Sequence, residues 1–145
     1  VNVPMPPYAA DDSYRRVFEE LVQPIVAEFK PQIIIRNGGS DPHFSDGLTN
    51  LGLSVEGFRM ITAKVREMSE ICQGKAVDLI ASGYNKTVLP YAWLALICGL
   101  GGMETRIEEP QGTATGFKGD SSLSEIEHVI AEVKRYHKDY WKCLR

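Results

Sequence analysis

Two short apolar runs, each followed at once by a glycine-rich stretch, constrain the fold of this chain more than any other feature. Residues 32–36 and 76–81 both have the length and composition of a buried strand. Between them, apolar side chains recur at helical spacing from Val55 to Ile71, directly after Ser54, a good helix N-cap. Because a strand, a helix and a strand in succession form a parallel pair, we expect an α/β fold: a parallel sheet with helices on both faces.

The remaining segments add three more helical patterns. Residues 17–29 have amphipathic spacing interrupted by Pro24, which predicts a helix with a kink. Residues 87–100 are apolar nearly all round, which predicts a buried helix. A last amphipathic helix is expected to begin after Ser122 as its N-cap, and the glycine- and threonine-bearing residues 104–120 before it should be irregular surface.

Composition excludes several classes of partner. The net charge of -3 disfavours nucleic acid and acidic membrane surfaces, and the longest apolar run, residues 91–100, is too short to span a bilayer. Three widely spaced cysteines are typical of reduced thiols in a cytoplasmic protein. The chain is one domain long, but a two-stranded parallel sheet leaves an open edge, so we expect a larger segment to complete it.

Asp41 and Tyr84 each lie just beyond one of the two expected strands. The carboxyl ends of parallel strands meet at one edge of a sheet, where ligands and metals bind. A carboxylate and a phenol delivered to that edge suggest a metal ligand and a hydrogen-bond donor to an electrophilic substrate. On spacing alone, each residue can equally be an ordinary loop or surface residue.

Four motifs in order resemble the zinc-dependent deacetylases, a family that includes histone deacetylases, acetylpolyamine amidohydrolases and acetoin utilization proteins. They are Asn2-Val3-Pro4-Met5-Pro6, Gly39-Ser40-Asp41 with Asp46 five residues on, Leu51-Gly52-Leu53-Ser54-Val55-Glu56-Gly57-Phe58, and Gly83-Tyr84-Asn85. The resemblance extends to about residue 100. It implies that residues 1–145 are a single domain, the C-terminal portion of a deacetylase-like catalytic domain with an arginase/deacetylase-type fold.

The resemblance also implies an activity and a set of roles. Asp41 matches an aspartate ligand of Zn²⁺, and Tyr84 matches the tyrosine that hydrogen-bonds the substrate carbonyl. Gly83 and Ser82 would lie beside the acyl chain as substrate-binding residues. The implied reaction is hydrolysis of an N-acetyl amide, on acetyl-lysine or an acetylated polyamine, with zinc polarising the carbonyl and the phenol stabilising the oxyanion.

Other parts of the family's machinery do not occur in this sequence. It has no adjacent His-His pair for acid–base chemistry and no further Asp-x-His and His-Gly ligand segments; its histidines are His43, His128 and His137. We therefore expect the N-terminal part of the same protein to supply them, and the isolated chain to be inactive. Ser40, Ala81 and Ser82 also depart from the family's usual Phe, Glu and Gly, which bears on substrate preference.

Alternative interpretations remain open at this level. The chain could be a catalytically silent deacetylase-like module with a binding or regulatory role, or a small α/β domain that binds an anion at residues 38–46. His43 could join Asp41 as a second ligand in Asp-Pro-His, although a loop histidine is favoured, and Asp46 is expected to organise the loop as a hydrogen-bond acceptor. A homo-oligomer is compatible with the sequence.

Overall fold

The computed structural model describes residues 1–113 and 119–145. Helices outnumber strands, and the elements follow one another in the alternating order that the sequence predicts. In chain order they are α1 (Asp11–Val17), a π-helical turn (Phe18–Val22), α2 (Gln23–Phe29), β1 (Ile34–Gly39), α3 (Val55–Ser69), a 3-10 turn (Glu70–Cys72), β2 (Ala76–Ser82), α4 (Leu89–Gly101), α5 (Leu123–His137) and a 3-10 turn (Lys142–Leu144).

The two strands form a parallel pair joined through α3, as predicted. β1 continues past the predicted end at residue 36, because Gly38 pairs with Ile80 and Gly39 pairs with Ser82. The register shifts between these two pairs, which leaves Ala81 as an extra residue in β2. The glycine-rich stretch is therefore partly strand, and the loop begins later than the composition suggests.

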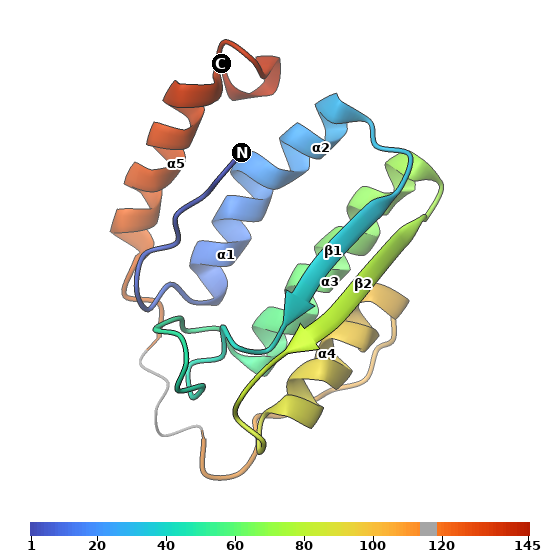
Figure 1. Ribbon diagram of the computed structural model, residues 1–145, viewed down its shortest axis with the longest axis vertical. Coiled ribbons are helices and arrows are strands. Elements are labelled where there is room, and N and C mark those ends of the chain that lie inside the picture. The colour runs from blue at the N-terminus through green and yellow to red at the C-terminus, as the bar shows by residue number, and fades with distance from the viewer. Residues whose placement is uncertain (114–118) are drawn as a thin grey trace.

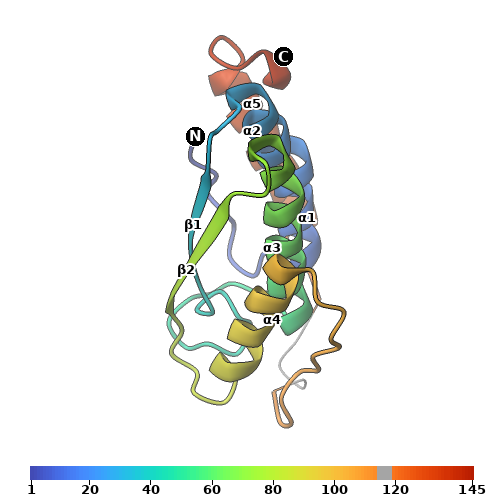
Figure 2. The same ribbon diagram turned by 90° about the vertical axis from the view of Figure 1, so that its right-hand side faces the viewer.

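Helices cover only one face of this sheet, as Figure 2 shows. The expectation of helices on both faces is therefore wrong for the described part of the chain. Ile35, Val77 and Leu79 point away from the helices and are largely exposed, whereas alternate residues are partly buried. The strands have the sequence pattern of a sheet that is buried on both faces. No described segment lies against the face that carries Ile35, Val77 and Leu79.

Two hydrophobic clusters make up the core. The first joins α3 and α4 and includes Phe58, Ile61 and Leu96. A Cβ at Gly99 would lie 2.2 Å from Thr62 Oγ1, so this glycine lets the two helices approach closely. The second cluster packs α5 against the first helix (Figure 1) and contains Val17, Leu21, Ile126, Ile130, Val133 and Leu144.

Helix α4 is less buried than its composition predicts. Its inward side carries Ala92 and Leu96, but Tyr91, Leu94 and Ile97 remain substantially exposed. The helix is thus another apolar surface that the described residues leave uncovered on one side. No helix in the described ranges is long and apolar enough to cross a membrane.

Pro24 shapes the first helix in the expected region. The helical path runs from Asp11 to Phe29, and the turn just before Pro24 is π-helical. A proline has no N–H to donate and its ring collides with the carbonyl four residues earlier, and a widened turn relieves both conflicts. The kink predicted from sequence therefore takes the form of this π-helical turn.

The predicted helix caps have different outcomes. Ser54 Oγ accepts the backbone N–H of Gly57 at 3.0 Å, which confirms Ser54 as the N-cap of α3. Ser122 occupies the N-cap position of α5 but makes no side-chain cap; its hydroxyl donates to the Pro7 carbonyl at 2.7 Å. The prediction for Ser122 is therefore wrong in mechanism, because the N-terminal segment competes for the same hydroxyl.

Candidate functional site

The carboxyl ends of β1 and β2 meet, as the parallel topology requires. The carbonyl of Ser82 accepts the backbone N–H of Ser40 at 2.8 Å and the indole N–H of Trp93 at 3.2 Å. Gly39 must be glycine here, since a Cβ would lie 1.8 Å from Ser82 Oγ and 2.7 Å from Ser82 O. The loops that carry Asp41 and Tyr84 therefore leave the sheet side by side.

Asp41 lies directly after this junction. Its Oδ1 accepts a hydrogen bond from the Ser82 hydroxyl, and its backbone carbonyl accepts one from Thr49 Oγ1 at 2.7 Å. The other carboxylate oxygen, Oδ2, has no hydrogen-bond partner within the described ranges. A half-buried carboxylate with one oxygen anchored and the other open is suited to be one ligand of a metal ion.

One ligand does not make a metal site. Across the described residues, no group of three or more His, Cys, Asp or Glu side chains could hold a metal ion. A catalytic zinc site needs three protein ligands. Asp41 fits one such position, and the other ligands would have to come from outside these residues.

Tyr84 is placed at the surface by a rigid turn. Gly83 has φ +144°, and a Cβ there would lie 1.9 Å from Ser40 Oγ, so no other residue fits without strain. The backbone N–H groups of Tyr84 and Asn85 both donate to Asp46 Oδ2, at 2.8 and 2.9 Å. The phenol itself is 62% exposed and is therefore available to a ligand.

Asp46 organises the loop, as predicted. Besides these two bonds, its Oδ1 accepts the backbone N–H of Leu48 at 3.0 Å, and the residue is 5% exposed. One buried carboxylate thus satisfies three backbone donors from two loops. Its oxygens are occupied by these N–H groups, which leaves it no role as a metal ligand.

His43 is fully buried. Its Nδ1 accepts the backbone N–H of Ser45 at 3.1 Å, so its Nε2 carries the proton and donates to Glu109 at 3.0 Å. The ring also stacks on Phe58, with centroids 6.2 Å apart. Both nitrogens are engaged, so the loop-histidine interpretation holds and the Asp-Pro-His pair is not a ligand pair.

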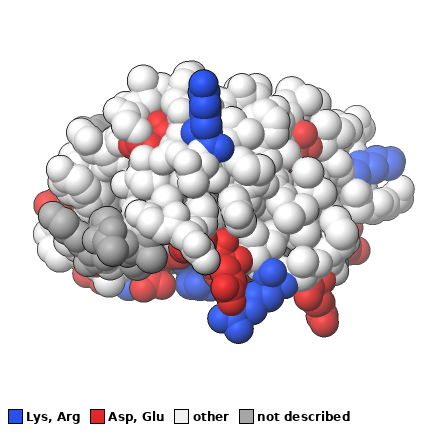
Figure 3. All heavy atoms as spheres, turned by 90° about the horizontal axis from the view of Figure 1, so that it is seen from below, with Lys and Arg blue, Asp and Glu red and all other residues white. Residues whose placement is uncertain are grey.

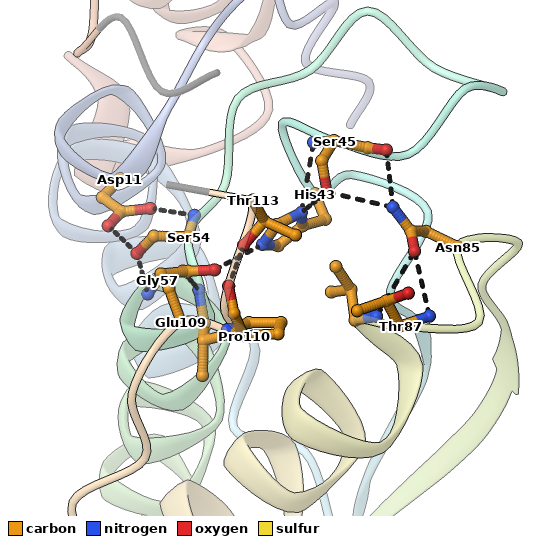
Figure 4. A network of polar contacts seen from close by, with 12 residues as sticks. Asp11, His43, Ser45, Ser54, Gly57, Asn85, Thr87, Glu109, Pro110 and Thr113 are labelled. Atoms are coloured by element: carbon orange, nitrogen blue, oxygen red, sulfur yellow. Dashed lines mark hydrogen bonds and ion pairs between the residues drawn. The ribbon is translucent and has the colours of Figure 1, made fainter. Parts of the chain in front are cut away.

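Figure 4 shows that His43 belongs to a polar network that joins segments far apart in the sequence. Glu109 also accepts the backbone N–H of Val55 at the start of α3, at 2.6 Å. On the other side, Asn85 donates to the Ser45 carbonyl at 2.8 Å and accepts the backbone N–H of Thr87 at 3.0 Å. The network fixes the turn that carries Tyr84.

Sequence reasoning missed two members of this site. Glu109 lies 66 residues from His43, in a segment without periodicity, and nothing local marks it. Trp93 was missed as well, because an indole in the nearly all-apolar residues 87–100 looks like an ordinary core side chain. The role of Asn85 could have been predicted, because it completes the Gly-Tyr-Asn motif and its side chain caps the following turn.

A second polar cluster lies between the sheet and the helices. Arg36 donates through Nη1 to both carboxylate oxygens of Asp78, at 2.8 and 2.6 Å, across the strand pair. Burial raises the pKa of the nearby Tyr14 phenol to about 12; the Asp41 carboxylate adds to that rise, and Arg36 opposes it. Tyr14 is therefore a neutral phenol near Asp41 at physiological pH.

The end of the molecule where both strands terminate has few charged side chains. Figure 3 views the protein from this end: most of the visible surface is uncharged, the largest group of Lys, Arg, Asp and Glu lies along the lower margin, and single charged side chains are scattered elsewhere.

Comparison with known proteins identifies the family. The sequence profile described as "Histone deacetylase domain" matches residues 1–100. A probable deacetylase of Archaeoglobus fulgidus is 37% identical over 151 residues, covering 100% of this chain and 42% of that protein. A histone deacetylase-like amidohydrolase of Pseudomonas aeruginosa is 32% identical over 111 residues, covering 76% and 29%. This chain thus spans less than half the length of these relatives.

Solved structures confirm the fold class. The histone deacetylase Clr3 superposes with a TM-score of 0.81 at 23% identity, covering 100% of this chain and 23% of that one. The HD domain of HDA15 gives 0.77 at 23% identity, covering 99% and 36%. Together with the sequence matches, these likenesses show that the chain belongs to the histone deacetylase domain family.

Proposed function

We propose that this chain supplies one side of the active site of a zinc-dependent hydrolase of N-acetyl amides. The observation that carries the proposal is the joining of the two strand ends. There, Asp41 has one carboxylate oxygen anchored by Ser82, and Tyr84 is exposed on a turn fixed by Asp46. Membership of the histone deacetylase domain family supports the same reaction class.

In this proposal each residue has a distinct role. Asp41 holds the metal as one carboxylate ligand, and Zn²⁺, when bound, polarises the amide carbonyl and lowers the pKa of bound water. The Tyr84 phenol donates a hydrogen bond to the carbonyl oxygen as negative charge develops on it. Gly83 lets the backbone approach an extended acyl chain, as only a residue without a side chain can at this φ.

The remaining groups are proposed to come from the N-terminal part of the same protein. This chain covers 42% of the archaeal relative, and its sequence has no adjacent His pair. Acid–base catalysis and the other metal ligands would lie in that part, packed against the uncovered apolar face of the sheet. The proposed substrates are acetylated lysine or acetylated polyamines, both neutral at the amide.

The test uses the complete protein and two variants. Asp41→Ala should lose both bound zinc and turnover of an acetyl-lysine peptide, whereas Tyr84→Phe should retain zinc and lose turnover, by at least about 100-fold for a single oxyanion donor. Zinc content by metal analysis separates the two effects. Full activity of Tyr84→Phe, or undiminished zinc in Asp41→Ala, would refute the assigned roles.

A catalytically silent deacetylase-like module is the second candidate, because the described residues contain no complete metal site. In that case the complete protein would bind no zinc and hydrolyse no acetyl-lysine peptide. An anion site at residues 38–46 is disfavoured, since Asp46 already occupies the N–H groups of Leu48, Tyr84 and Asn85, and Asp41 places a second carboxylate there.

A further inference from the structure

Neighbouring residues hold both the backbone and the side chain of Ser82. Its carbonyl accepts hydrogen bonds from the backbone of Ser40 and the indole of Trp93. Its side chain fills the space that Gly39 leaves by having no Cβ. It also directly follows Ala81, the extra residue of the register shift. The alternation of β2 continues through this point and places Ser82 on the same partly buried side as Asp78 and Ile80, so its hydroxyl is aimed inward.

The target of that hydroxyl is Asp41. Ser82 Oγ donates to Oδ1 of the carboxylate, and the half-buried setting of both residues limits competition from water. A carboxylate on a loop otherwise rotates about two side-chain torsions. With Oδ1 anchored, Oδ2 remains as the oxygen with no hydrogen-bond partner in the described part of the chain.

We propose that Ser82 is a positioning residue that orients the Asp41 carboxylate for metal binding, and that its hydroxyl does not contact substrate. The inference rests on the proposed function in one respect only, the assignment of Asp41 as a zinc ligand. The deacetylases that this chain resembles usually have glycine at the position of Ser82, and glycine could not donate this hydrogen bond. The bond from Ser82 to Asp41 is therefore a feature of this chain. Hydrogen-bonded partners of metal ligands typically change metal affinity by about 10- to 100-fold when removed.

The first experiment needs no metal and uses the complete protein in its metal-free form. A double-mutant cycle compares Ser82→Ala, Asp41→Ala and the double variant in urea unfolding. We expect non-additive losses of stability, because each single change breaks the same hydrogen bond. Additive losses would show that the two side chains are not coupled and would overturn the inference. If Ser82→Ala does not fold, Ser82→Thr, which retains the hydroxyl, replaces it in the cycle. Replacing Asp41 should then lower the free energy of unfolding of Ser82→Thr by as much as it lowers that of the parent, which would support the bond.

The second experiment measures zinc affinity in the complete protein by competition with a chelator. Ser82→Ala should weaken zinc binding about 10-fold, with turnover falling mainly because the site is unfilled, so that saturating zinc restores kcat and leaves KM for peptide unchanged. Ser40→Ala is the matched control, because Ser40 Oγ contacts the Ser82 carbonyl, at 3.4 Å, rather than the Asp41 carboxylate. It should bind zinc as the parent does.

The outcomes separate this inference from the proposed function. If Asp41→Ala binds zinc normally, the ligand assignment fails and so does the role of Ser82. If Asp41→Ala loses zinc while Ser82→Ala binds it like the parent, only the positioning role is overturned. A raised KM for the peptide at saturating zinc in Ser82→Ala would instead place the hydroxyl at the substrate.

Discussion

The Asp46 carboxylate accepts the backbone N–H of Tyr84 at 2.8 Å, across a separation of 38 residues. This bond joins the loop after β1 to the turn after β2. The same carboxylate accepts the N–H groups of Asn85 and Leu48. The position of the phenol therefore depends on a carboxylate that has no part in the proposed chemistry.

Replacing Asp46 should destabilise the chain and loosen the Tyr84 turn. Asp46→Ala leaves three backbone donors without their acceptor at a site that is 5% exposed, and we expect a loss of about 2–4 kcal/mol in the free energy of unfolding. Asp46→Asn is the matched control, since its amide oxygen can still accept, and should cost about half as much. Urea denaturation measures both; an Asp46→Ala variant as stable as Asp46→Asn would contradict this account.

Local sequence patterns predicted the elements of the fold well. The strand pair, α3 with its Ser54 cap, and the organising role of Asp46 all follow from short-range signals: β-branched runs, helical spacing, and a carboxylate in a glycine-rich loop. The resemblance to deacetylases rests on four short motifs, and these alone indicate the family. Each of these signals lies within about ten residues of the feature that it predicts.

Features that depend on distant partners were not predictable in this way. The hydrogen bond between His43 and Glu109, 66 residues away, leaves no local pattern in the sequence. Alternation along β2 places Ser82 on the inner side, but the register shift that pairs Ser82 with Gly39 has no local signal in the sequence. Helices were predicted on both faces of the sheet because the strands are apolar on both faces. The described residues supply no segment that covers the second face.

The buried His43 ring should contribute to stability through its two nitrogens. His43→Phe keeps an aromatic ring to stack on Phe58 but leaves the Ser45 N–H and Oε2 of Glu109 without their imidazole partner. We expect a loss of about 2 kcal/mol. Glu109→Gln is the control, because its amide oxygen still accepts the Val55 N–H or the imidazole N–H. Equal stability of His43→Phe and the parent in urea would show that the network contributes nothing.

Asp120 should act as a cap for a helix that begins more than a hundred residues earlier. Its carboxylate accepts the backbone N–H of Ser13 at 2.6 Å and of Ala10 at 3.1 Å, at the start of α1, and also the N–H of Ser122 at 3.1 Å, before α5. Asp120→Ala should therefore lower the free energy of unfolding by about 1–3 kcal/mol, the range for one or two lost caps.

The control for this cap is Asp120→Asn, which keeps an acceptor and should recover most of the loss. Hydrogen exchange locates the effect: in Asp120→Ala the amides of Ser13 and Ser122 should exchange faster, while those in the centre of α3 keep their relative protection. Unchanged exchange at Ser13 would mean that solvent satisfies that N–H as well as the carboxylate does.

Tyr14 should make the stability of the chain fall at alkaline pH. Burial, together with the nearby Asp41 carboxylate, raises the pKa of its phenol from 10.0 to about 12 in the folded protein, despite the opposing effect of Arg36. A folded state that binds the phenolic proton more tightly than the unfolded chain is stabilised below pH 10, and this contribution is lost as the pH rises from 10 to 12. One pKa unit corresponds to about 1.4 kcal/mol, so the expected loss is about 3 kcal/mol.

Comparison with Tyr14→Phe isolates this contribution from the lysines and other tyrosines that titrate in the same range. The difference in free energy of unfolding between the parent and Tyr14→Phe should be constant from about pH 7 to 9 and should then shift toward the variant by about 3 kcal/mol by about pH 12. Urea denaturation at each pH gives the two curves. Parallel curves over the whole range would show that the phenol ionises as readily in the folded chain as in the unfolded one, and that Tyr14 is not held neutral beside Asp41.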